Sequence, residues 1–470
     1  MAQINTRKAT GPGTIKNIQI FSNTEHKSVY LTDLIIDNFK YYESLFQDVI
    51  HASVTYIDSG GTIKAKGGGQ LTTAVAGLPI TGSEKVNLLF EDPNEEEIEV
   101  TLYVNNVTEI VTDSTKSMVT LSMNSLELFN NDKVRLNRRF DGKISDHIEK
   151  ILKGGKGESG DSLETEKDVD IEPTVGEYNK AFTNKKPFYM MNYFSTRAVP
   201  EGGQGNSAGF LLWETSEGFH FKSIDKLFGQ KEKKSIIFNE TPGNPPKGYD
   251  IKALTFDKQN RNNIKSKLEQ GTYATRIITF DPFTLNYEVS YLNAGNKKQS
   301  GPKQKGNEDT LNKGGEELPK LSGDIKSAKG GQNDFSRTTF QLLDTGSIPQ
   351  GKTKSGVDQS DDRTGGNEQV EKKEDKNAKP GETLNQAIMR LNQMNTMKIS
   401  MTLPGDFTLH AGDAVKVDSP QLSAARQSRK RQKVDDQTGG LYIIRDLCHY
   451  MTKDVTYTKV NVVRDSFGKK

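Results

Sequence analysis

Cysteine is nearly absent from this chain of 470 residues, in which Cys448 stands alone. A single thiol excludes an internal disulfide and any zinc site built from several cysteines, and it fits assembly in a reducing cytoplasm. Long apolar runs are absent too, because no segment approaches the roughly 20 residues that cross a bilayer. The polar start MAQINTRKATGPG lacks the apolar centre of a signal peptide. We therefore expect a soluble chain without a membrane anchor.

An excess of charge of one sign is also missing. Lys and Arg total 64 and Asp and Glu total 62, which leaves a formal net charge of +2. This excludes a global basic field that recruits nucleic acid. Hydrophobic residues make up 33% and the mean hydropathy is -0.70, so apolar positions must be concentrated in some segments and diluted in others. The length predicts about three domains.

The first region alternates between apolar and polar residues from Ile15 to Leu128, in short runs such as IKNIQIF, SVYLTDLII, KVNLLFED and SMVTLSMNSLELF. This period of two predicts roughly six to eight strands of an antiparallel barrel or sandwich, within a first domain at 1–135. The glycine-rich KAKGGGQ lies between two of these strands, and no helix follows it to supply aligned N–H groups to an anion. We interpret it as a hairpin or bulge connection.

A second domain, at 136–228, is predicted to be an α+β side domain. Its helix places Ile144, Ile148, Ile151 and Leu152 on one face, ahead of a glycine stop. The polar stretch KGGKGESGDSLETEKDVD follows, and we expect a surface loop that buries no apolar side chain. The segment GFLLWETSEGFHFKSIDKLF predicts a hairpin with its turn at TSEG, leading into a short helix.

The remaining residues, 229–470, are predicted to form a second β-rich domain interrupted by polar insertions at about 293–335 and 345–381, with a strand between them at Ser336–Asp344. Leu384, Ala387, Ile388 and Leu391 form one face of a later helix. Alternating segments then predict five strands: MKISMTL, DFTLH, DAVKVD, GLYIIRDLCHYM and VTYTKVNVVRD.

One segment matches a nucleotide-binding motif. Gly346-Ser347-Ile348-Pro349-Gln350-Gly351-Lys352-Thr353 satisfies the phosphate-loop pattern and follows the strand-like FQLLD. That chemistry needs Lys352 and Thr353 to open a helix whose N-terminus faces the phosphates. The polar SGVDQSDDRTGGNEQ follows instead, without an apolar face. The match is therefore typical of a Gly/Lys-rich loop, and nucleotide binding is kept as an alternative.

Other reactive residue types show no spacing that indicates chemistry. The histidines are scattered without a metal-binding pattern, at His26, His51, His147, His220, His410 and His449. Cys448 and His449 are adjacent on a predicted strand and should point to opposite faces. The run Glu95–Glu97 follows Pro93, as in a solvated hairpin tip. The basic tract at 426–433 is interpreted as a solvated loop or a contact for an acidic partner. We expect no catalytic, cofactor-binding or metal site.

The order of these units resembles the central baseplate hub family of contractile-tailed, T-even-like phages. The resemblance covers nearly the whole chain and rests on YYESLFQDVIHASVTYIDS, RRFDGKISDHIEKIL, FLLWETSEGFHFKSIDKLF, TLPGDFTLHAGDAVKVD and LYIIRDLCHYM. It implies a mainly β chain with α+β side domains, in which two antiparallel β-barrels of tail-tube type share one chain and the second is discontinuous. The loops at 293–381 depart from the family's compact members.

The resemblance also implies a function. A hub is a structural protein and not an enzyme, a homotrimeric adaptor that joins the hexameric tail tube to the trimeric central spike and lines the DNA channel. Its partners would be the central spike protein, the tail tube or tube-initiator protein, inner baseplate proteins and the tape-measure protein, without sequence-specific nucleic acid binding. Its location would be the virion tail baseplate, after assembly in the host bacterial cytoplasm. Another tail structural or spike-carrying protein is the alternative within this class.

Overall fold

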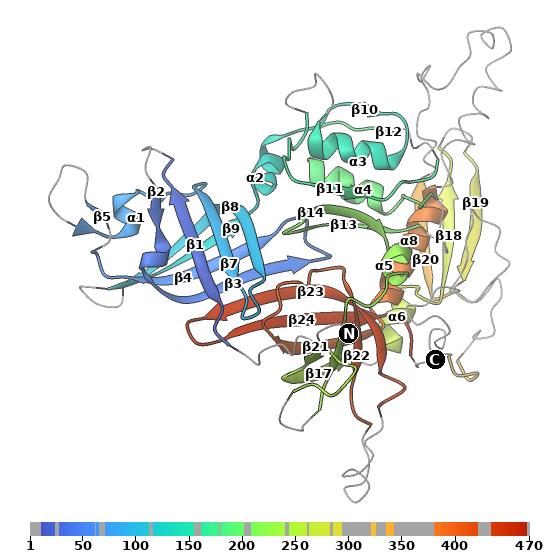
Figure 1. Ribbon diagram of the computed structural model, residues 1–470. Helices are drawn as coiled ribbons and strands as arrows, with labels where there is room; N and C mark the ends of the chain where they lie inside the picture. The colour runs from blue at the N-terminus through green and yellow to red at the C-terminus, as the bar shows by residue number, and fades with distance from the viewer. Residues whose placement is uncertain are drawn as a thin grey trace, which may run out of the picture.

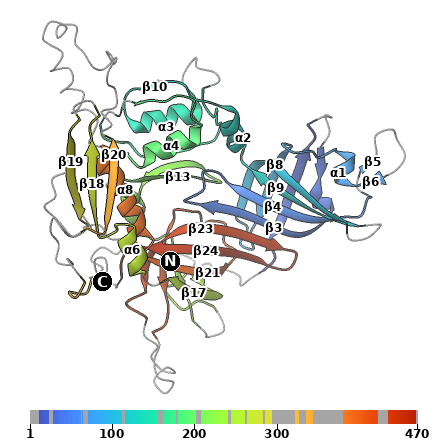
Figure 2. The ribbon, with the colours of Figure 1, turned by 180° about the vertical axis from the view of Figure 1, so that it is seen from behind.

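The computed structural model describes residues 11–23, 28–61, 63–64, 71–111, 116–154, 161–176, 178, 180–201, 208–239, 244–260, 263–282, 285–293, 321–325, 335–342, 380–421 and 434–467. The chain is mainly β, as the alternating segments predict, and its largest sheet has 14 strands. Figures 1 and 2 show two β-rich parts side by side, a mixed α/β part above them and a small three-stranded sheet at one side. No helix among the described residues is long and apolar enough to cross a membrane.

The first β-rich part, called unit 1, has nine strands and two short helices among the described residues of 14–124. The strands are β1 (Thr14–Phe21), β2 (Ser28–Tyr30), β3 (Ile35–Ser44), β4 (His51–Asp58), β5 (Ile63–Lys64), β6 (Leu71–Thr72), β7 (Lys85–Glu91), β8 (Glu97–Val111) and β9 (Ser117–Asn124). The helices are η1 (Leu31–Asp33) and α1 (Ala74–Gly77). The order β3-β4-β9-β8-β7-β1-β2 forms one end of the large sheet.

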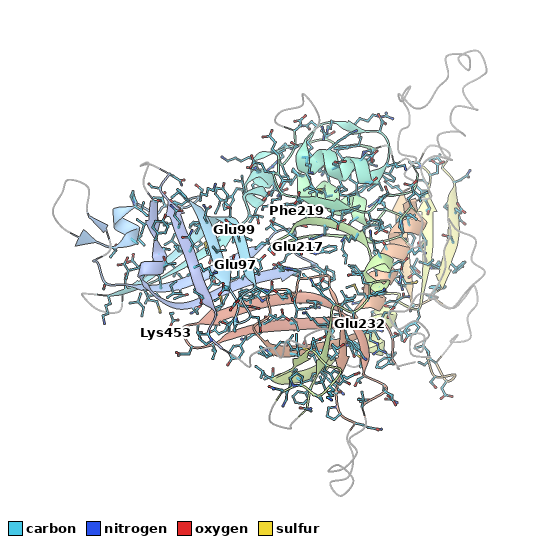
Figure 3. The ribbon with its side chains drawn as sticks, viewed as in Figure 1. Glu97, Glu99, Glu217, Phe219, Glu232 and Lys453 are labelled. Carbon is cyan, nitrogen blue, oxygen red and sulfur yellow. The ribbon has the colours of Figure 1, made fainter. Side chains whose placement is uncertain are left out.

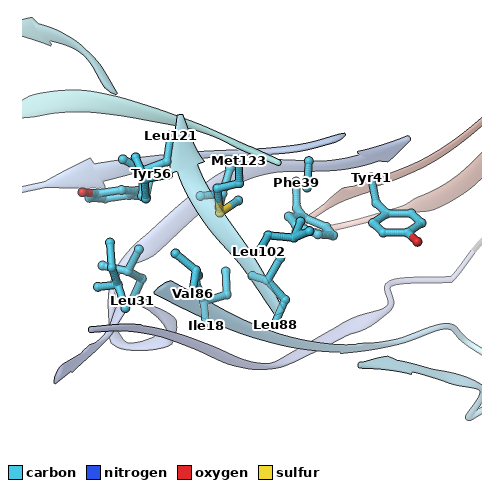
Figure 4. Close-up of a cluster of buried hydrophobic side chains, with 14 of the residues drawn as sticks. Ile18, Leu31, Phe39, Tyr41, Tyr56, Val86, Leu88, Leu102, Leu121 and Met123 are labelled. Atoms are coloured by element: carbon cyan, nitrogen blue, oxygen red, sulfur yellow. The ribbon is translucent and has the colours of Figure 1, made fainter. Parts of the chain in front are cut away.

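Inward-facing residues of β1, β3, β4, β7, β8 and β9 share a common core, shown in Figure 4. Aromatic side chains fill much of it, with Phe39 against Phe90 at a ring distance of 4.7 Å and Tyr41 against Phe90 at 5.6 Å. Aromatic rings bury more apolar area than other side chains, so they dominate the stability of such a core. Two residues from the far end of the chain, Phe407 and Met451, complete it.

The mixed part, called the side region, follows unit 1 in sequence. Its elements are α2 (Leu126–Lys133), β10 (Arg139–Phe140), α3 (Ile144–Lys153), β11 (Val169–Ile171), β12 (Lys180–Ala181), α4 (Pro187–Ser195), β13 (Phe210–Thr215), β14 (Gly218–Ser223) and α5 (Ile224–Phe228). The predicted helix face is confirmed, because Ile148 and Ile151 are fully buried. The predicted hairpin is also confirmed, with Thr215 paired to Gly218 across its turn.

The second β-rich part, called unit 2, is assembled from separate pieces of sequence. Its strands are β15 (Lys234–Ile237), β16 (Ile251–Lys252), β17 (Thr255–Asn260), β21 (Met397–Pro404), β22 (Ala414–Asp418), β23 (Gly440–Thr452) and β24 (Thr456–Arg464). The chain between β17 and β21 forms α6 (Ile264–Glu269), β18 (Ala274–Phe280), β19 (Tyr287–Asn293), β20 (Arg337–Leu342) and α8 (Pro380–Met394). The sheet of β18 to β20 is separate from the large one.

Three local predictions are wrong. The polar stretch after α3 does bury an apolar side chain, because Leu163 is fully buried in the side-region core. The segment DFTLH is not a strand, since its backbone donates to side chains and not to a neighbouring strand. The run ending in SLELF does not stay extended, because helix α2 begins at Leu126.

Helix α8 is enclosed on more sides than its apolar pattern predicts. Ala387 is buried, as expected, but Leu384, Ile388 and Leu391 are only half-buried. The most deeply buried side chains include Met394 and the polar Gln393. A buried polar side chain needs a partner, and Gln393 accepts a hydrogen bond from the Arg390 guanidinium at 3.1 Å.

Units 1 and 2 share one arrangement of five strands. In chain order, β3, β4, β7, β8 and β9 correspond to β17, β21, β22, β23 and β24. In both units the fourth strand pairs with the third and the fifth, the fifth pairs with the second, and the second pairs with the first. All of these ladders are antiparallel. Within the described residues, no ladder closes either unit into a barrel.

The correspondence extends to individual residues. Each fourth strand carries one extra residue opposite the fifth, Asn105 in β8 and Arg445 in β23, at the same distance before the last pair of its hairpin. With this bulge aligned, the inward positions coincide as well. Val119, Leu121 and Met123 of unit 1 then match Thr458, Val460 and Val462 of unit 2, and all six are buried. A bulge is a built feature of a strand, so its recurrence supports a true equivalence.

Candidate assembly site

The junction of the two units contains buried polar groups that bond across several parts of the chain. Strand β23 is long enough to serve both units: its first residues pair with β22, and its later residues, from Asp446 to Thr452, pair with β3. Strand β24 follows the other edge of β23. The ladder between β3 and β23, called the seam, therefore joins units 1 and 2 into a single sheet.

Aromatic and histidine side chains pack along the inner face of the seam. Tyr41 of β3 stacks on His449 of β23, with ring centroids 6.0 Å apart, and Phe407 meets His449 edge-on at 4.6 Å. Burial lowers the pKa of His449 to about 3, so this imidazole is neutral at ordinary pH. On the outer face, the Lys40 ammonium lies 5.9 Å from the centre of the Tyr450 ring.

Glu43 is a fully buried carboxylate at the end of this ladder. It accepts hydrogen bonds from the Tyr41 hydroxyl at 2.9 Å, the Ser216 N–H at 3.1 Å and the Ala411 N–H at 3.0 Å, and it lies 3.2 Å from His410 Nδ1. These partners come from unit 1, the side region and unit 2. Buried carboxylates are costly unless fully bonded, so this one residue fixes three parts of the chain relative to one another.

Glu43 and His410 form a charged pair. Burial raises the pKa of Glu43, but the charge and hydrogen bond of His410 outweigh it, so the pKa lies below its ordinary value. Burial lowers the pKa of His410, and the charge and hydrogen bond of Glu43 overcome this and raise it. Each ion thus keeps the other charged in a buried place.

A second buried carboxylate, Glu214 of β13, ties the side region to unit 1. It accepts from Ser125 Oγ at 2.7 Å, from the Ile50 N–H at 3.0 Å and from Lys167 Nζ at 2.5 Å. Burial raises the pKa of Glu214, and the charge of Lys167 opposes that rise. Lys167 also contacts Glu127 at 2.8 Å. The sequence prediction of an exposed loop missed Lys167, because nothing in its neighbourhood shows an apolar period.

A cavity of about 340 Å³ lies beside Glu214, between β8 and the turn of β13 and β14. Figure 3 labels Glu99 and Glu217 on its two sides. Its lining also includes Glu166, Asp168 and Lys167. The chemistry available here is ion pairing and hydrogen bonding, which suits a fixed junction.

Asp92 makes another tie between units 1 and 2. Its carboxylate accepts from the N–H groups of Asn94 at 2.7 Å and Glu96 at 3.0 Å, inside the turn from β7 to β8, and from the Phe407 N–H at 3.2 Å. The turn is therefore closed by the same side chain that holds the loop before β22. Glu95 and Glu96 are exposed at this hairpin tip, as the sequence predicts.

The remaining sequence candidates do not converge on one place. The motif containing Lys352, the basic tract at 426–433 and His26 lie outside the described residues. Cys448 and His449 contact different faces of β23, since Cys448 lies opposite Tyr42 and His449 packs on Tyr41. His147 is buried in α3, and His220 lies 2.9 Å from the Thr215 hydroxyl. Among the described residues, no group of three or more His, Cys, Asp or Glu side chains could hold a metal ion.

Comparisons with known proteins found similar solved structures and no matching family. No protein-family model and no curated protein matches it. The tail protein from Neisseria meningitidis MC58 has 8% identity and a TM-score of 0.47, covering 96% of both chains. The prophage MuSo2 43 kDa tail protein from Shewanella oneidensis has 9% identity and a TM-score of 0.49, covering 96% of this chain and 99% of that chain. An Escherichia coli component of the type VI secretion system, described as similar to T4 tail proteins, has 7% identity and a TM-score of 0.41, covering 97% of this chain and 77% of that chain.

Proposed function

We propose that this chain is a structural protein of a phage tail, the central baseplate hub of a contractile tail. The observation that carries the proposal is the shared strand order and register of units 1 and 2, which makes the chain a tandem pair of equivalent β units. The sequence resemblance to the hub family supports the same assignment. The buried junction supports a structural role, because its charged groups are bonded to one another across three parts of the chain.

In this proposal the functional form is a homotrimer with two tail-tube-type barrels per chain. Three copies of a tandem pair would surround an axis with six equivalent units while keeping threefold symmetry. Such a ring would match a hexameric tail tube on one side and a trimeric spike on the other, and its lumen would pass DNA. We propose three domains, at 1–135, 136–228 and 229–470. The partners in this proposal include tube-initiator, inner baseplate and tape-measure proteins. The protein would lie in the virion baseplate after assembly in the host cytoplasm.

Light scattering of the purified chain, alone and mixed with its spike protein, tests the proposal. We expect a mass of three copies, and a ring in negative-stain images. A chain that stays monomeric or dimeric with and without the spike would exclude the hub. A trimer that binds the spike but not the tube would favour the alternative of another spike-carrying tail protein.

The alternative of a nucleotide-binding protein has its own test. Labelled ATP should not bind to the wild-type chain, and Lys352→Ala should leave assembly unchanged. Saturable binding that Lys352→Ala removes would favour the alternative. Duplex DNA binding through 426–433 is tested by its dependence on salt, because phosphate contacts weaken steeply as salt rises.

A further inference from the structure

The two strands of the seam have equivalents elsewhere in the chain that are not paired with each other. Within one chain, β3 of unit 1 pairs with the later half of β23 of unit 2. The strand equivalent to β3 is β17, and the strand equivalent to β23 is β8. Both of these have an edge without a ladder among the described residues.

The later half of β8 is paired on one edge only. Strand β7 pairs with β8 up to Tyr103, and β9 pairs with it up to Val111. On β23, the corresponding edge from Asp446 onwards is covered by β3. Thr108 is exposed on β8 and Ile110 is 54% exposed, although their equivalents Cys448 and Tyr450 are half-buried at the seam. The unpaired edge of β8 therefore corresponds to the edge of β23 that β3 covers.

Strand β17 has the complementary free edge. It pairs with β21 alone, whereas its equivalent β3 pairs with β4 on one edge and with β23 on the other. Leu254, just before β17, is 43% exposed, and Thr255 and Asp257 are exposed as well. Unpaired edges of this kind template pairing with another chain.

These two edges lie at opposite ends of one run of strands, β17-β21-β24-β23-β3-β4-β9-β8. Each half of this run has the same four strands in the same order, and only the seam joins the halves. A second copy that is added in the same way would repeat the seam. Such head-to-tail contacts close into a ring when the rotation between copies divides a full turn.

We propose that β17 of one copy pairs antiparallel with the later half of β8 of the next copy, in the register of the seam. Tyr450 lies opposite Lys40 across the seam, and the equivalent pair is Ile110 opposite Asp257 of the neighbouring copy. The partner is therefore a second copy of this chain, and the contact is heterologous. This inference rests on the proposed function and adds to it the strands that close the ring.

Paired cysteines test the ladder in the full-length chain, with Cys448→Ala as the background. Opposed residues of an antiparallel ladder are close enough for a disulfide. We expect Ile110→Cys with Asp257→Cys to give covalent oligomers under mild oxidation, ending at one closed species. The matched control, Lys40→Cys with Tyr450→Cys, should form a disulfide within one chain and keep the mobility of a single chain on a denaturing gel.

The outcomes separate this inference from the proposed function. A trimer in which the control pair links and the Ile110 and Asp257 pair does not would overturn the ladder and leave the hub standing. A disulfide between Ile110→Cys and Asp257→Cys within one chain would also overturn the ladder. Head-to-tail species that grow beyond three copies would support the ladder and contradict the trimer. A chain that stays monomeric with its spike would exclude both.

Discussion

Unit 1 and unit 2 reach the same arrangement of strands from different sequence layouts. Unit 1 is contiguous, whereas unit 2 is interrupted between β17 and β21 by an insertion whose described residues form α6, α8 and the sheet of β18 to β20. The ladder from β17 to β21 forms in spite of this insertion, with Phe256 opposite Met401. A long insertion costs little loop entropy beyond that of a short one, so the ladder between β17 and β21 can form across it.

The two cores also differ in composition. Unit 1 packs around aromatic rings, including Phe39, Tyr41 and Phe90, whereas unit 2 uses Met, Val and Ile side chains with one buried tyrosine, Tyr442. Unit 2 additionally buries the Arg464 guanidinium, which donates to the Gly439 carbonyl at 2.8 Å. Equivalent backbones therefore do not need equivalent side chains, provided that the inward positions stay filled.

Equivalent core positions should be equally sensitive to a buried charge. Leu121→Asp in unit 1 and Val460→Asp in unit 2 each place an unpaired carboxylate in a core, and each should lower the free energy of unfolding by on the order of 4 kcal/mol. Urea denaturation measures the loss. Lys459→Ala, at an exposed neighbouring position, should change little. A mild effect at Val460 alone would show that unit 2 is the more loosely packed of the two.

Removing the buried carboxylate should separate the two units. Glu43→Ala leaves His410 charged without its partner and removes an acceptor from the Ala411 and Ser216 N–H groups, at a cost of about 3–5 kcal/mol. We expect calorimetry to record two unfolding transitions for this variant and one for the wild type. Glu43→Gln keeps a carbonyl acceptor and should cost less. An unsplit transition in the alanine variant would mean that the ladder between β3 and β23 holds the units together without Glu43.

The stabilisation that the Glu43 and His410 pair contributes should depend on pH. The raised pKa of His410 gives stability that is fully present below its ordinary value of 6.5 and is lost as pH rises through the folded value. The lowered pKa of Glu43 gives stability that is present above 4.5 and is lost as pH falls through the folded value. The difference in unfolding free energy between wild type and His410→Gln should therefore be largest between those pH values. Burial and the charge of His410 lower the pKa of His449, so this imidazole favours unfolding in acid, and more so in the wild type than in His410→Gln. A difference that does not change from pH 5 to pH 9 would contradict the assigned pair.

The smallest effect on stability is expected at the free edge of β8. Ile110→Asp changes an exposed side chain, so the free energy of unfolding should move by less than about 0.5 kcal/mol. Assembly, measured by light scattering, should nevertheless be weakened, because the new carboxylate would lie opposite Asp257 of the next copy and like charges directly opposite on a ladder repel. Tyr450→Ala, at the equivalent position of the seam, removes the ring that Lys40 and Lys459 pack on, so it should reduce stability and leave the free edge intact. An Ile110→Asp chain that assembles normally would place the contact elsewhere.

Local structure was largely predictable from the sequence. The period of two located most strands of both units, and the helical period found the buried face of α3, with Ile148 at its centre. The strand prediction failed where side chains, and not a neighbouring strand, accept the backbone hydrogen bonds. DFTLH has an alternating pattern, but two of its backbone N–H groups donate to Asp92 and Thr458. Lys167 and Leu163 were missed because burial in a polar segment depends on partners that are distant in sequence.

The sequence by itself indicated most of the extended segments and most of the residues that face inward. Only the tertiary structure decided that units 1 and 2 are equivalent and that the seam joins them. Val460 and Leu121 occupy matching positions without a shared motif, because alternation specifies a face and leaves the partner strand open. Glu43 draws its partners from residues 216, 410 and 411, and only the folded chain brings those groups within hydrogen-bonding distance of one carboxylate.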